Sequence, residues 1–218
     1  MLSTLDGVCR VNHPGAINEA AYKPYQLALA RRLGLLVPRT LLTNNPDAFQ
    51  RFYEECRGHV IYKLLGFPAY EVEDGAIAST YTSHVPETLL HEAYRIKATT
   101  HLFQEFQEKI FDLRVIVIGK KVFAIEIHPL SKETRLDFRL DYRALRYTVH
   151  TLPAEIEGAL LAMVQAYGLK YAAIDLIYTV ERRYIFLELN AVGQLGWLEE
   201  PTGLPLFASL AQFLAGVS

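Results

Sequence analysis

The C-terminal part of the sequence brings together residue types that bind hard metal ions. Asp175 lies in the apolar run 171–180 (YAAIDLIYTV), and Glu188 and Asn190 lie in the next apolar run, 184–190 (YIFLELN). Since only the short polar stretch ERR separates the two runs, we predict that they form an antiparallel hairpin. Carboxylate and amide oxygens are ligands that Mg²⁺ accepts in proteins, so this pairing indicates a candidate metal site.

The length of the hairpin loop decides whether the two acids meet. Because side chains alternate between the two faces of a strand, one face of the second strand is expected to carry Tyr184, Phe186, Glu188 and Asn190. With an even-numbered loop, Asp175 lies directly opposite Glu188, and Ala173 lies opposite Asn190. An odd-numbered loop would place the two acids on opposite faces of the sheet.

Directly opposed carboxylates destabilise a sheet, so a cation is expected between Asp175 and Glu188. Two kinds of cation satisfy this requirement: a bound Mg²⁺ ion, or a structural lysine or arginine from elsewhere in the chain. Asn190 favours the metal, because its amide oxygen adds a third hard ligand on the same face.

Composition sets limits on the class of protein. The chain has 218 residues, of which 51% are hydrophobic, which is enough for one large domain or two small ones. With 22 basic and 24 acidic residues, it shows no electrostatic footprint for nucleic acid or for a membrane surface. Cys9 and Cys56 have no metal-type spacing and fit a reducing compartment. Without a signal peptide or a membrane-span pattern, the protein is expected to be cytoplasmic.

The elements that position the two acids are predicted from periodicity and turn signals. Helices are predicted at 16–34 with a restart at Pro24, at 46–56 with Asn45 as N-cap, and at 152–169. Strands are predicted at 37–43, 59–66, 77–85 and 101–106, and at 112–128 as a hairpin about Gly119. Residues 131–150 receive no assignment. Strands joined mostly through hairpins predict an α+β fold rather than a doubly wound parallel sheet.

Several blocks of the sequence resemble a known family. Residues 174–194 (IDLIYTVERRYIFLELNAVGQ) resemble the metal-binding segment of ATP-grasp ligases, in which an acid and an E-x-N hold the Mg²⁺ ions that bridge the ATP phosphates. Further blocks, in the same order along the chain, resemble the microviridin-type (graspetide) macrocyclases, ATP-grasp enzymes that modify ribosomally made peptides. These blocks are 13–49, 103–127, 137–139 (DFR), 152–176 and 193–206.

The resemblance implies an ATP-grasp fold with two lobes, each with an antiparallel sheet and helices, and with the nucleotide between them. It implies an N-terminal segment and helix at 1–40, a central lobe at 41–103 and a C-terminal lobe with the metal site at 104–218. Two features depart from the family: most of the usual N-terminal domain is missing from this sequence, and Ala191 stands where the family has proline. The first departure puts the completeness of the site in doubt, and the second changes only the rigidity of the loop.

The resemblance also implies roles for residues that contact the nucleotide. Lys23 and Lys63 would bind the phosphates. The alternative for Lys23 is that it lies on a solvated helix face, and the alternative for Lys63 is that it extends into solvent from the end of a strand. Adenine would bind the backbone of a hinge, and the ribose would bind Asp112. The hinge consists of Gln104, Glu105 and Phe106.

Two arginines resemble those that hold the transferred phosphoryl group and the reacting carboxylate. Arg114 lies in an apolar strand, where a guanidinium is expected only if an anion meets it. Arg139 lies in the DFR block, and its alternative role is a surface cation in a basic loop. The implied cofactors are ATP and Mg²⁺, with Asp175, Glu188 and Asn190 as the metal ligands.

The preferred hypothesis is an ATP-dependent carboxylate–amine or carboxylate–hydroxyl ligase that acts through an acyl phosphate. By resemblance, its substrates are Asp or Glu side chains of a precursor peptide, which become ester or amide crosslinks. Three alternatives remain: a ligase of free amino acids or other small carboxylates, a nucleotide-binding subunit that needs a companion chain, and a domain whose hairpin holds only a structural ion pair. A homodimer is also expected.

Overall fold

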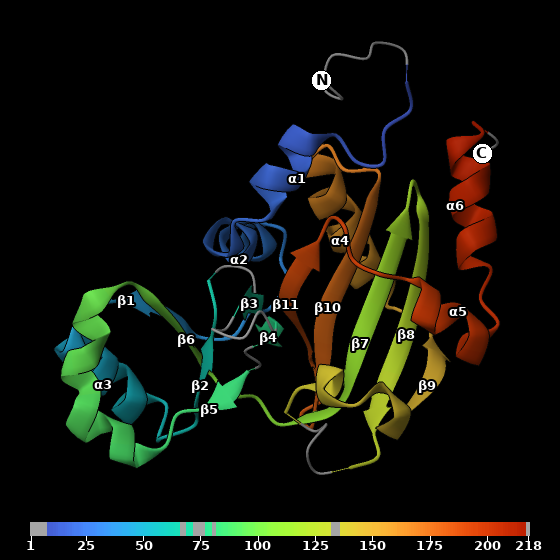
Figure 1. Ribbon diagram of the computed structural model, residues 1–218. Helices are drawn as coiled ribbons and strands as arrows, with labels where there is room; N and C mark the ends of the chain where they lie inside the picture. The colour runs from blue at the N-terminus through green and yellow to red at the C-terminus, as the bar shows by residue number, and fades with distance from the viewer. Residues whose placement is uncertain (1–7, 66–68, 72–76, 80–81, 132–135, 217–218) are drawn as a thin grey trace. The chain divides into compact units, whose positions relative to one another are not determined.

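The computed structural model describes residues 8–65, 69–71, 77–79, 82–131 and 136–216. The chain divides into two compact units (Figure 1). Unit 1 contains residues 1–37, 109–130 and 145–218, and unit 2 contains residues 38–108 and 131–144. Each unit is built on an antiparallel sheet with helices, so the predicted α+β class is confirmed. Among the described residues, no helix is long and apolar enough to cross a membrane.

Unit 1 is organised around a five-stranded antiparallel sheet in the order β11-β10-β7-β8-β9. Its strands are β7 (Lys109–Ile118), β8 (Lys121–Pro129), β9 (Leu145–His150), β10 (Tyr171–Thr179) and β11 (Tyr184–Asn190). Its helices are α1 (Pro14–Ala20), α2 (Lys23–Arg32), α4 (Ala154–Ala166), α5 (Gly196–Thr202) and α6 (Leu206–Leu214). The β7–β8 hairpin turns at Gly119, which has a φ of 60°, as the sequence predicted.

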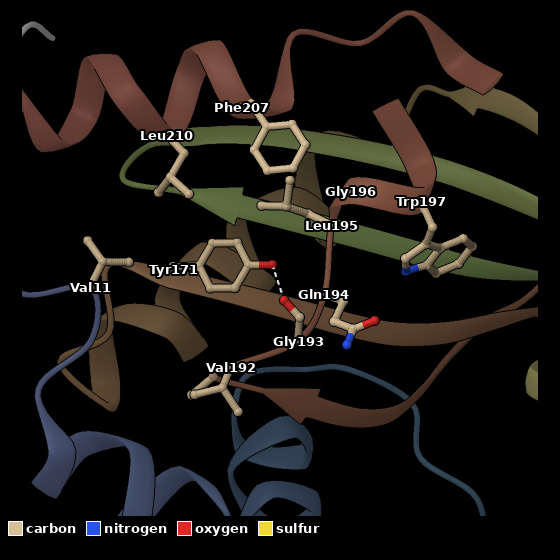
Figure 2. A pocket seen from close by; sticks show the side chains of 11 residues that line it. Val11, Tyr171, Val192, Gly193, Gln194, Leu195, Gly196, Trp197, Phe207 and Leu210 are labelled. Atoms are coloured by element: carbon tan, nitrogen blue, oxygen red, sulfur yellow. Dashed lines mark hydrogen bonds between the residues drawn. The ribbon is translucent and has the colours of Figure 1, made fainter. Parts of the chain in front are cut away.

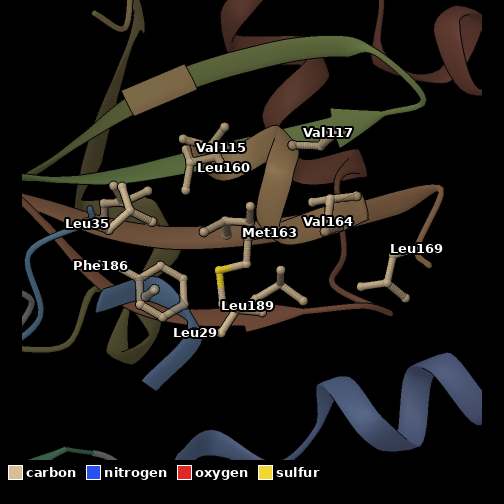
Figure 3. Close-up of a cluster of buried hydrophobic side chains, with 14 of the residues drawn as sticks. Leu29, Leu35, Val115, Val117, Leu160, Met163, Val164, Leu169, Phe186 and Leu189 are labelled. Atoms are coloured by element: carbon tan, nitrogen blue, oxygen red, sulfur yellow. The ribbon is translucent and has the colours of Figure 1, made fainter. Parts of the chain in front are cut away.

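The two faces of this sheet are covered by different helices. Helices α2 and α4 pack on one face, where Leu29, Leu160 and Met163 meet Val115 and the other core side chains drawn in Figure 3. Helices α5 and α6 pack on the other face through Leu198 and Leu206. Because strand residues alternate, β7 and β10 bury apolar side chains on both faces, which explains why their sequences read as nearly continuous apolar runs.

Unit 2 contains a four-stranded antiparallel sheet in the order β1-β6-β2-β5 and a separate pair, β3-β4. Its strands are β1 (Thr40–Thr43), β2 (Val60–Lys63), β3 (Ala69–Glu71), β4 (Ile77–Ser79), β5 (Ser83–His84) and β6 (His101–Glu105). Its helices are α3 (Pro46–Glu55) and the 3-10 helices η2 (Glu87–Ala98), η4 (Phe138–Leu140) and η5 (Tyr142–Ala144). Asn45 caps α3 as predicted, since its side chain accepts hydrogen bonds from the backbone N–H groups of Asp47 and Ala48.

The register of the β10–β11 hairpin is as predicted at the two acids but is reached in another way. Thr179 N–H donates to Arg183 C=O at 3.0 Å, so the turn holds three residues, and Arg182 takes a left-handed φ of 59°. A β-bulge then shifts the register between Asp175 and Leu176, and beyond it Asp175 lies opposite Glu188.

The bulge also corrects the prediction of which side chains share a face of β11. Phe186 and Leu189 both belong to the core under α2 and α4, although an odd spacing of three residues separates them. The extra residue of the bulge, Leu187, causes this. Phe186 and Tyr184 therefore do not share a face with Glu188 and Asn190, and that prediction was wrong.

A half-buried carboxylate and its neighbours link three strands of the unit 1 sheet, β8, β9 and β11. Glu126 on β8 lies 2.7 Å from His128 Nε2 and 2.7 Å from His150 Nδ1, and His150 Nε2 lies 2.8 Å from the hydroxyl of Tyr184. Burial alone would raise the pKa of Glu126, but the hydrogen bonds with His150 and His128 outweigh it and hold the pKa below its ordinary value. The charged form of Glu126 therefore stabilises the fold.

We predict that Glu126→Gln lowers the free energy of unfolding at neutral pH and that this loss shrinks in acid. Because the pKa of Glu126 is lowered in the folded state, its stabilising effect is present above its unfolded-state pKa and disappears as the pH falls through the folded-state value. Urea unfolding at several pH values below neutral measures the difference. The exposed Glu155→Gln serves as the control. A difference that stays constant from neutral pH into acid would contradict the prediction.

Candidate active site

The predicted metal ligands lie close together on β10 and β11 of the unit 1 sheet. Asp175 on β10 pairs with Glu188 on β11, and Ala173 pairs with Asn190. Asn190 is the last residue of β11 and begins the loop that leaves the sheet. The Asn190 side-chain oxygen accepts a hydrogen bond from the Val192 N–H at 2.9 Å, which fixes the first turn of this loop.

A cation from unit 1 meets each carboxylate. Arg114 on β7 is the other cross-strand partner of Asp175, and its Nη1 lies 2.7 Å from both carboxylate oxygens. Lys23, at the start of α2, places its Nζ 3.2 Å from Glu188 Oε2. Two protein cations therefore balance the like charges of the two acids. A lysine or an arginine was one of the two kinds of cation expected there. Lys23 is only 28% exposed, so it does not lie on a solvated helix face.

Arg114 is a permanently charged group inside the sheet. Its exposed fraction is 8%. Burial alone would lower its pKa, but the charge and hydrogen bonds of Asp175 outweigh it, and the pKa is raised. Its Nε atom is buried without a hydrogen-bond partner among the described residues. Nη1 holds Asp175, so the guanidinium retains donors that an anionic substrate group could use.

The donor set of the candidate metal site fits Mg²⁺ rather than a metal held by the protein alone. In the described part of the chain, no group of three histidine, cysteine, aspartate or glutamate side chains is arranged to hold a metal ion. The set here is two carboxylates and one amide. Each carboxylate oxygen has two lone pairs, so a carboxylate that contacts a protein cation can also bind a metal ion. Mg²⁺ suits such a set because it takes its remaining ligands from water and phosphate.

Asp112 lies on the same strand as Arg114, two residues earlier. It is 5% exposed, and its carboxylate binds Lys109 Nζ at 2.7 Å. No pattern in the sequence indicated this ion pair. The ribose contact implied by the resemblance stays a prediction for Asp112.

The loop after Asn190 packs tightly against the site through Gly193. A Cβ atom at Gly193 would lie 2.4 Å from Ala173 Cβ and 3.1 Å from Arg114 Nη2. The Gly193 carbonyl also accepts a hydrogen bond from the Tyr171 hydroxyl (Figure 2). Burial raises the pKa of Tyr171 to about 12, which keeps this donor protonated. Nothing in the sequence indicated the role of Tyr171, because a tyrosine in an apolar strand carries no signal of it.

The same loop forms one wall of an apolar cavity of about 560 Å³ in unit 1. Figure 2 shows the cavity between β10, the loop and α6. Its other walls include Val11, Trp197, Phe207 and Leu210. Trp197 is partly buried, and its ring lies 5.6 Å from that of Tyr147, so it contributes to the core of this face.

The remaining predicted nucleotide contacts belong to unit 2. Lys63 ends β2 and is half-buried. Gln104 on β6 is 2% exposed, and its side chain donates to the Thr40 hydroxyl at 3.0 Å. The hinge N–H groups of Glu105 and Phe106 already donate to the carbonyls of Arg39 and His59. A base bound at this hinge would therefore use carbonyl groups or the N–H groups that follow.

Arg139, also in unit 2, is held by a buried acid. Its Nε lies 2.7 Å from one oxygen of Asp137, and its Nη2 lies 2.5 Å from the other. Burial alone would raise the pKa of Asp137, but Arg139 outweighs it and the pKa is lowered. The geometry presents Arg139, which is 37% exposed, as an oriented guanidinium rather than a freely moving surface cation.

Gly193→Ala is predicted to destabilise the protein by about 1–3 kcal/mol, because the new methyl group overlaps Ala173 and presses on Arg114. Thermal and urea unfolding measure the loss. The matched control is Gly158→Ala on α4, where no atom lies within 4 Å of the added carbon. This control should be neutral or stabilising by up to about 1 kcal/mol. Equal stabilities of the two variants would show that the loop adapts to the methyl group.

The chain is similar to a known protein family. The sequence of residues 21–214 matches the RimK-like ATP-grasp domain. Among curated proteins, a probable alpha-L-glutamate ligase of Legionella pneumophila (strain Corby) is 26% identical over 212 residues, which cover 95% of this chain and 67% of that protein.

Solved structures of peptide-modifying enzymes are similar to the whole chain. Macrocyclase MdnC from Microcystis aeruginosa MRC, bound with precursor peptide MdnA, is 32% identical with a TM-score of 0.88, covering 100% of this chain and 68% of that one. A RiPP-associated ATP-grasp ligase of Chryseobacterium gregarium, in complex with ADP and a leader and core peptide, is 30% identical with a TM-score of 0.90. It covers 100% and 66% of the two chains.

The similarity to these macrocyclases confirms the resemblance found in the sequence. The chain spans about two thirds of the length of each relative. The match to the family covers most of the chain, including every candidate site residue from Lys23 to Asn190. This protein therefore belongs to the RimK-like ATP-grasp family of ATP-dependent ligases.

Proposed function

We propose that this protein activates a carboxylate with ATP and joins it to a hydroxyl or an amine. The observation that carries the proposal is the pair of opposed acids, Asp175 and Glu188, with Arg114 and Lys23 beside them. A structural ion pair needs one cation and one acid. A cluster of four charges, next to an amide and a glycine loop, suits a site that binds phosphate oxygens through metal and cations together.

In the proposed reaction, a carboxylate oxygen of the substrate attacks the γ-phosphorus of ATP, and the bond from that phosphorus to the β,γ-bridging oxygen breaks. The products are an acyl phosphate and ADP. A hydroxyl or amine then attacks the acyl carbon, phosphate leaves, and the nucleophile loses its proton. Mg²⁺ bound by Asp175, Glu188 and Asn190 would neutralise phosphate charge. Arg114 would orient the reacting anionic groups, and Lys23 would stabilise charge on the phosphates.

The proposed nucleotide contacts outside this cluster are Lys63, the hinge 104–106, Asp112 and Arg139. Lys63 would contact a phosphate, the hinge would bind adenine and Asp112 the ribose. Arg139 would hold the reacting carboxylate or the transferred phosphoryl group, and its fork-shaped contact with Asp137 supports an oriented guanidinium.

For the substrate, we propose Asp or Glu side chains of a precursor peptide, which form ester or amide crosslinks. The support is that MdnC and the Chryseobacterium ligase, which have similar structures, are each bound to peptides. A second candidate is the ligation of free glutamate, favoured by the names of the curated relatives. A companion chain or a second copy of this chain could complete either site.

The first test is calorimetric titration of ATP, with and without Mg²⁺, into the wild type and into Glu188→Ala/Asn190→Ala. The wild type is expected to bind in a saturable, Mg²⁺-dependent manner. The double variant should bind at least about tenfold more weakly in the presence of Mg²⁺, since even partners behind a metal's ligands contribute tenfold or more to metal affinity. The control is Glu155→Ala/Glu157→Ala on α4. Failure of the wild type to bind would reject the proposal.

A second experiment separates the two substrates. We predict that an acidic, hydroxyl-rich precursor peptide loses the mass of one water for each crosslink when incubated with protein and Mg·ATP. Addition of glutamate would instead increase the mass of an acceptor by one glutamate residue. Mass spectrometry of each reaction distinguishes the outcomes. Glutamate addition without water loss from the peptide would overturn the peptide assignment and leave the ligase assignment in place.

A further inference from the structure

The strand that carries Glu188 and Asn190 is an edge strand, so one side of its backbone has no neighbouring strand in the described structure. Leu36 supplies a short parallel bridge at Ile185, and its C=O accepts from the Phe186 N–H at 2.8 Å. Farther along, at Leu189, a side chain replaces the missing strand. Unpaired backbone groups at this depth would cost free energy, so they must find partners.

That side chain is Gln26 on α2, which is 2% exposed. Its Nε2 donates to the Leu189 carbonyl at 2.8 Å, and its Oε1 accepts from the Leu189 N–H at 2.8 Å. The amide therefore makes both hydrogen bonds that a neighbouring strand would make at this residue. Nε2 also donates to the Ala20 carbonyl at the end of α1, so both of its donors are used.

A second buried amide, Asn12, acts on the other side of Asn190. Its exposed fraction is 9%. Its Nδ2 donates to the carbonyls of Ala191 at 2.7 Å and Tyr171 at 2.8 Å, and its Oδ1 accepts from the N–H groups of Lys170 and Tyr171 at 2.8 and 3.1 Å. Asn12 thereby joins the start of β10 to the residue that follows Asn190.

The two amides hold the backbone immediately before and after Asn190. Leu189 also directly follows Glu188, so the Gln26 contact fixes the peptide that joins the two proposed metal ligands. On the same helix, Lys23 is one turn before Gln26 and pairs with Glu188. One turn of α2 therefore supplies both a hydrogen-bonding template for β11 and a cation for its carboxylate.

Hydrophobic burial alone does not account for these two side chains. An apolar side chain would fill the space of either residue without the cost of desolvating an amide. Buried amides whose hydrogen bonds are all made specify one backbone arrangement, which is what a metal site with bond lengths near 2 Å requires.

We propose that Gln26 and Asn12 are positioning residues that set the places of Glu188 and Asn190 for Mg²⁺-dependent nucleotide binding. This inference rests on the proposed function. Because both side chains are almost fully buried, they act through the backbone of β11.

The test compares the wild type with Gln26→Met and Asn12→Leu, which preserve approximate volume and remove the amide. The control is Thr179→Val at the turn end of the same hairpin, where the fully buried hydroxyl accepts from the Arg183 N–H. Hydrogen exchange of the β11 amides is measured without nucleotide. ATP titrations with and without Mg²⁺ are measured by calorimetry.

We expect Gln26→Met to speed exchange of the Leu189 amide and to weaken Mg·ATP binding about tenfold, the usual effect of removing a group that orients a metal ligand. ATP binding without Mg²⁺ should be unchanged, which separates positioning from general loss of structure. Asn12→Leu should act in the same direction through Ala191. Thr179→Val should lower thermal stability with no effect on Leu189 exchange or on Mg²⁺ dependence.

Three results would overturn the inference. Unchanged exchange at Leu189 in Gln26→Met would show that the amide does not hold the strand. Faster exchange with an unchanged Mg²⁺ dependence would show a merely structural role. If the wild type itself binds no Mg·ATP, the proposed function fails and the inference fails with it. If only the inference is wrong, the wild type still binds Mg·ATP. If Gln26→Met does not fold, Asn12→Leu decides by the same criteria.

Discussion

The electrostatic conflict between Asp175 and Glu188 is the constraint on which the rest of unit 1 depends. Directly opposed carboxylates are tolerated in a sheet only when cations offset them. The fold supplies Arg114 from the neighbouring strand β7 and Lys23 from helix α2. Lys23 precedes Arg114 in the sequence by about 90 residues. The strand order β11-β10-β7 and the position of α2 beside β11 therefore place the cations that stabilise the two opposed acids. Charges held in this way are already oriented, as the proposed binding of phosphate would require.

The position of β11 at the sheet edge has a second consequence. An edge strand leaves one side of its backbone accessible to a side chain, and Gln26 uses that side at Leu189. In the middle of a sheet, the backbone of Glu188 and Asn190 would be fixed by two strands, but Lys23 could not reach a carboxylate around the edge. The edge thus allows a cation from a helix to reach the site, and the buried amides restore the rigidity that the missing strand would have given.

The sequence predicted those features that depend on local pattern or on residue type. The Asn45 cap, the Gly119 turn and the pairing of Asp175 with Glu188 follow from short-range rules, and all three are present. The pairing succeeded although the assumed turn was wrong, because an odd turn and the bulge at Leu187 compensate for each other. A bulge depends on how β11 packs under α2 and α4, which no local pattern in YIFLELN reveals. The 3-10 helix η2 and the contacts of Asn12 and Gln26 depend in the same way on partners distant in sequence.

The charged cluster is suited to chemistry that different carboxylate substrates share. Arg114, Lys23, Asp175, Glu188 and Asn190 would act on phosphate oxygens and on the reacting carboxylate, groups that a peptide and free glutamate have in common. Discrimination between these substrates must therefore come from side chains that contact the rest of the substrate. In unit 1, the loop after Asn190 links the charged cluster directly to the apolar cavity lined by Trp197 and Phe207, with Gly193 in contact with Arg114 on one side and hydrogen-bonded to Tyr171 on the other. A change in that cavity would reach the charged cluster through a single peptide, because Gly193 has no room to absorb the displacement.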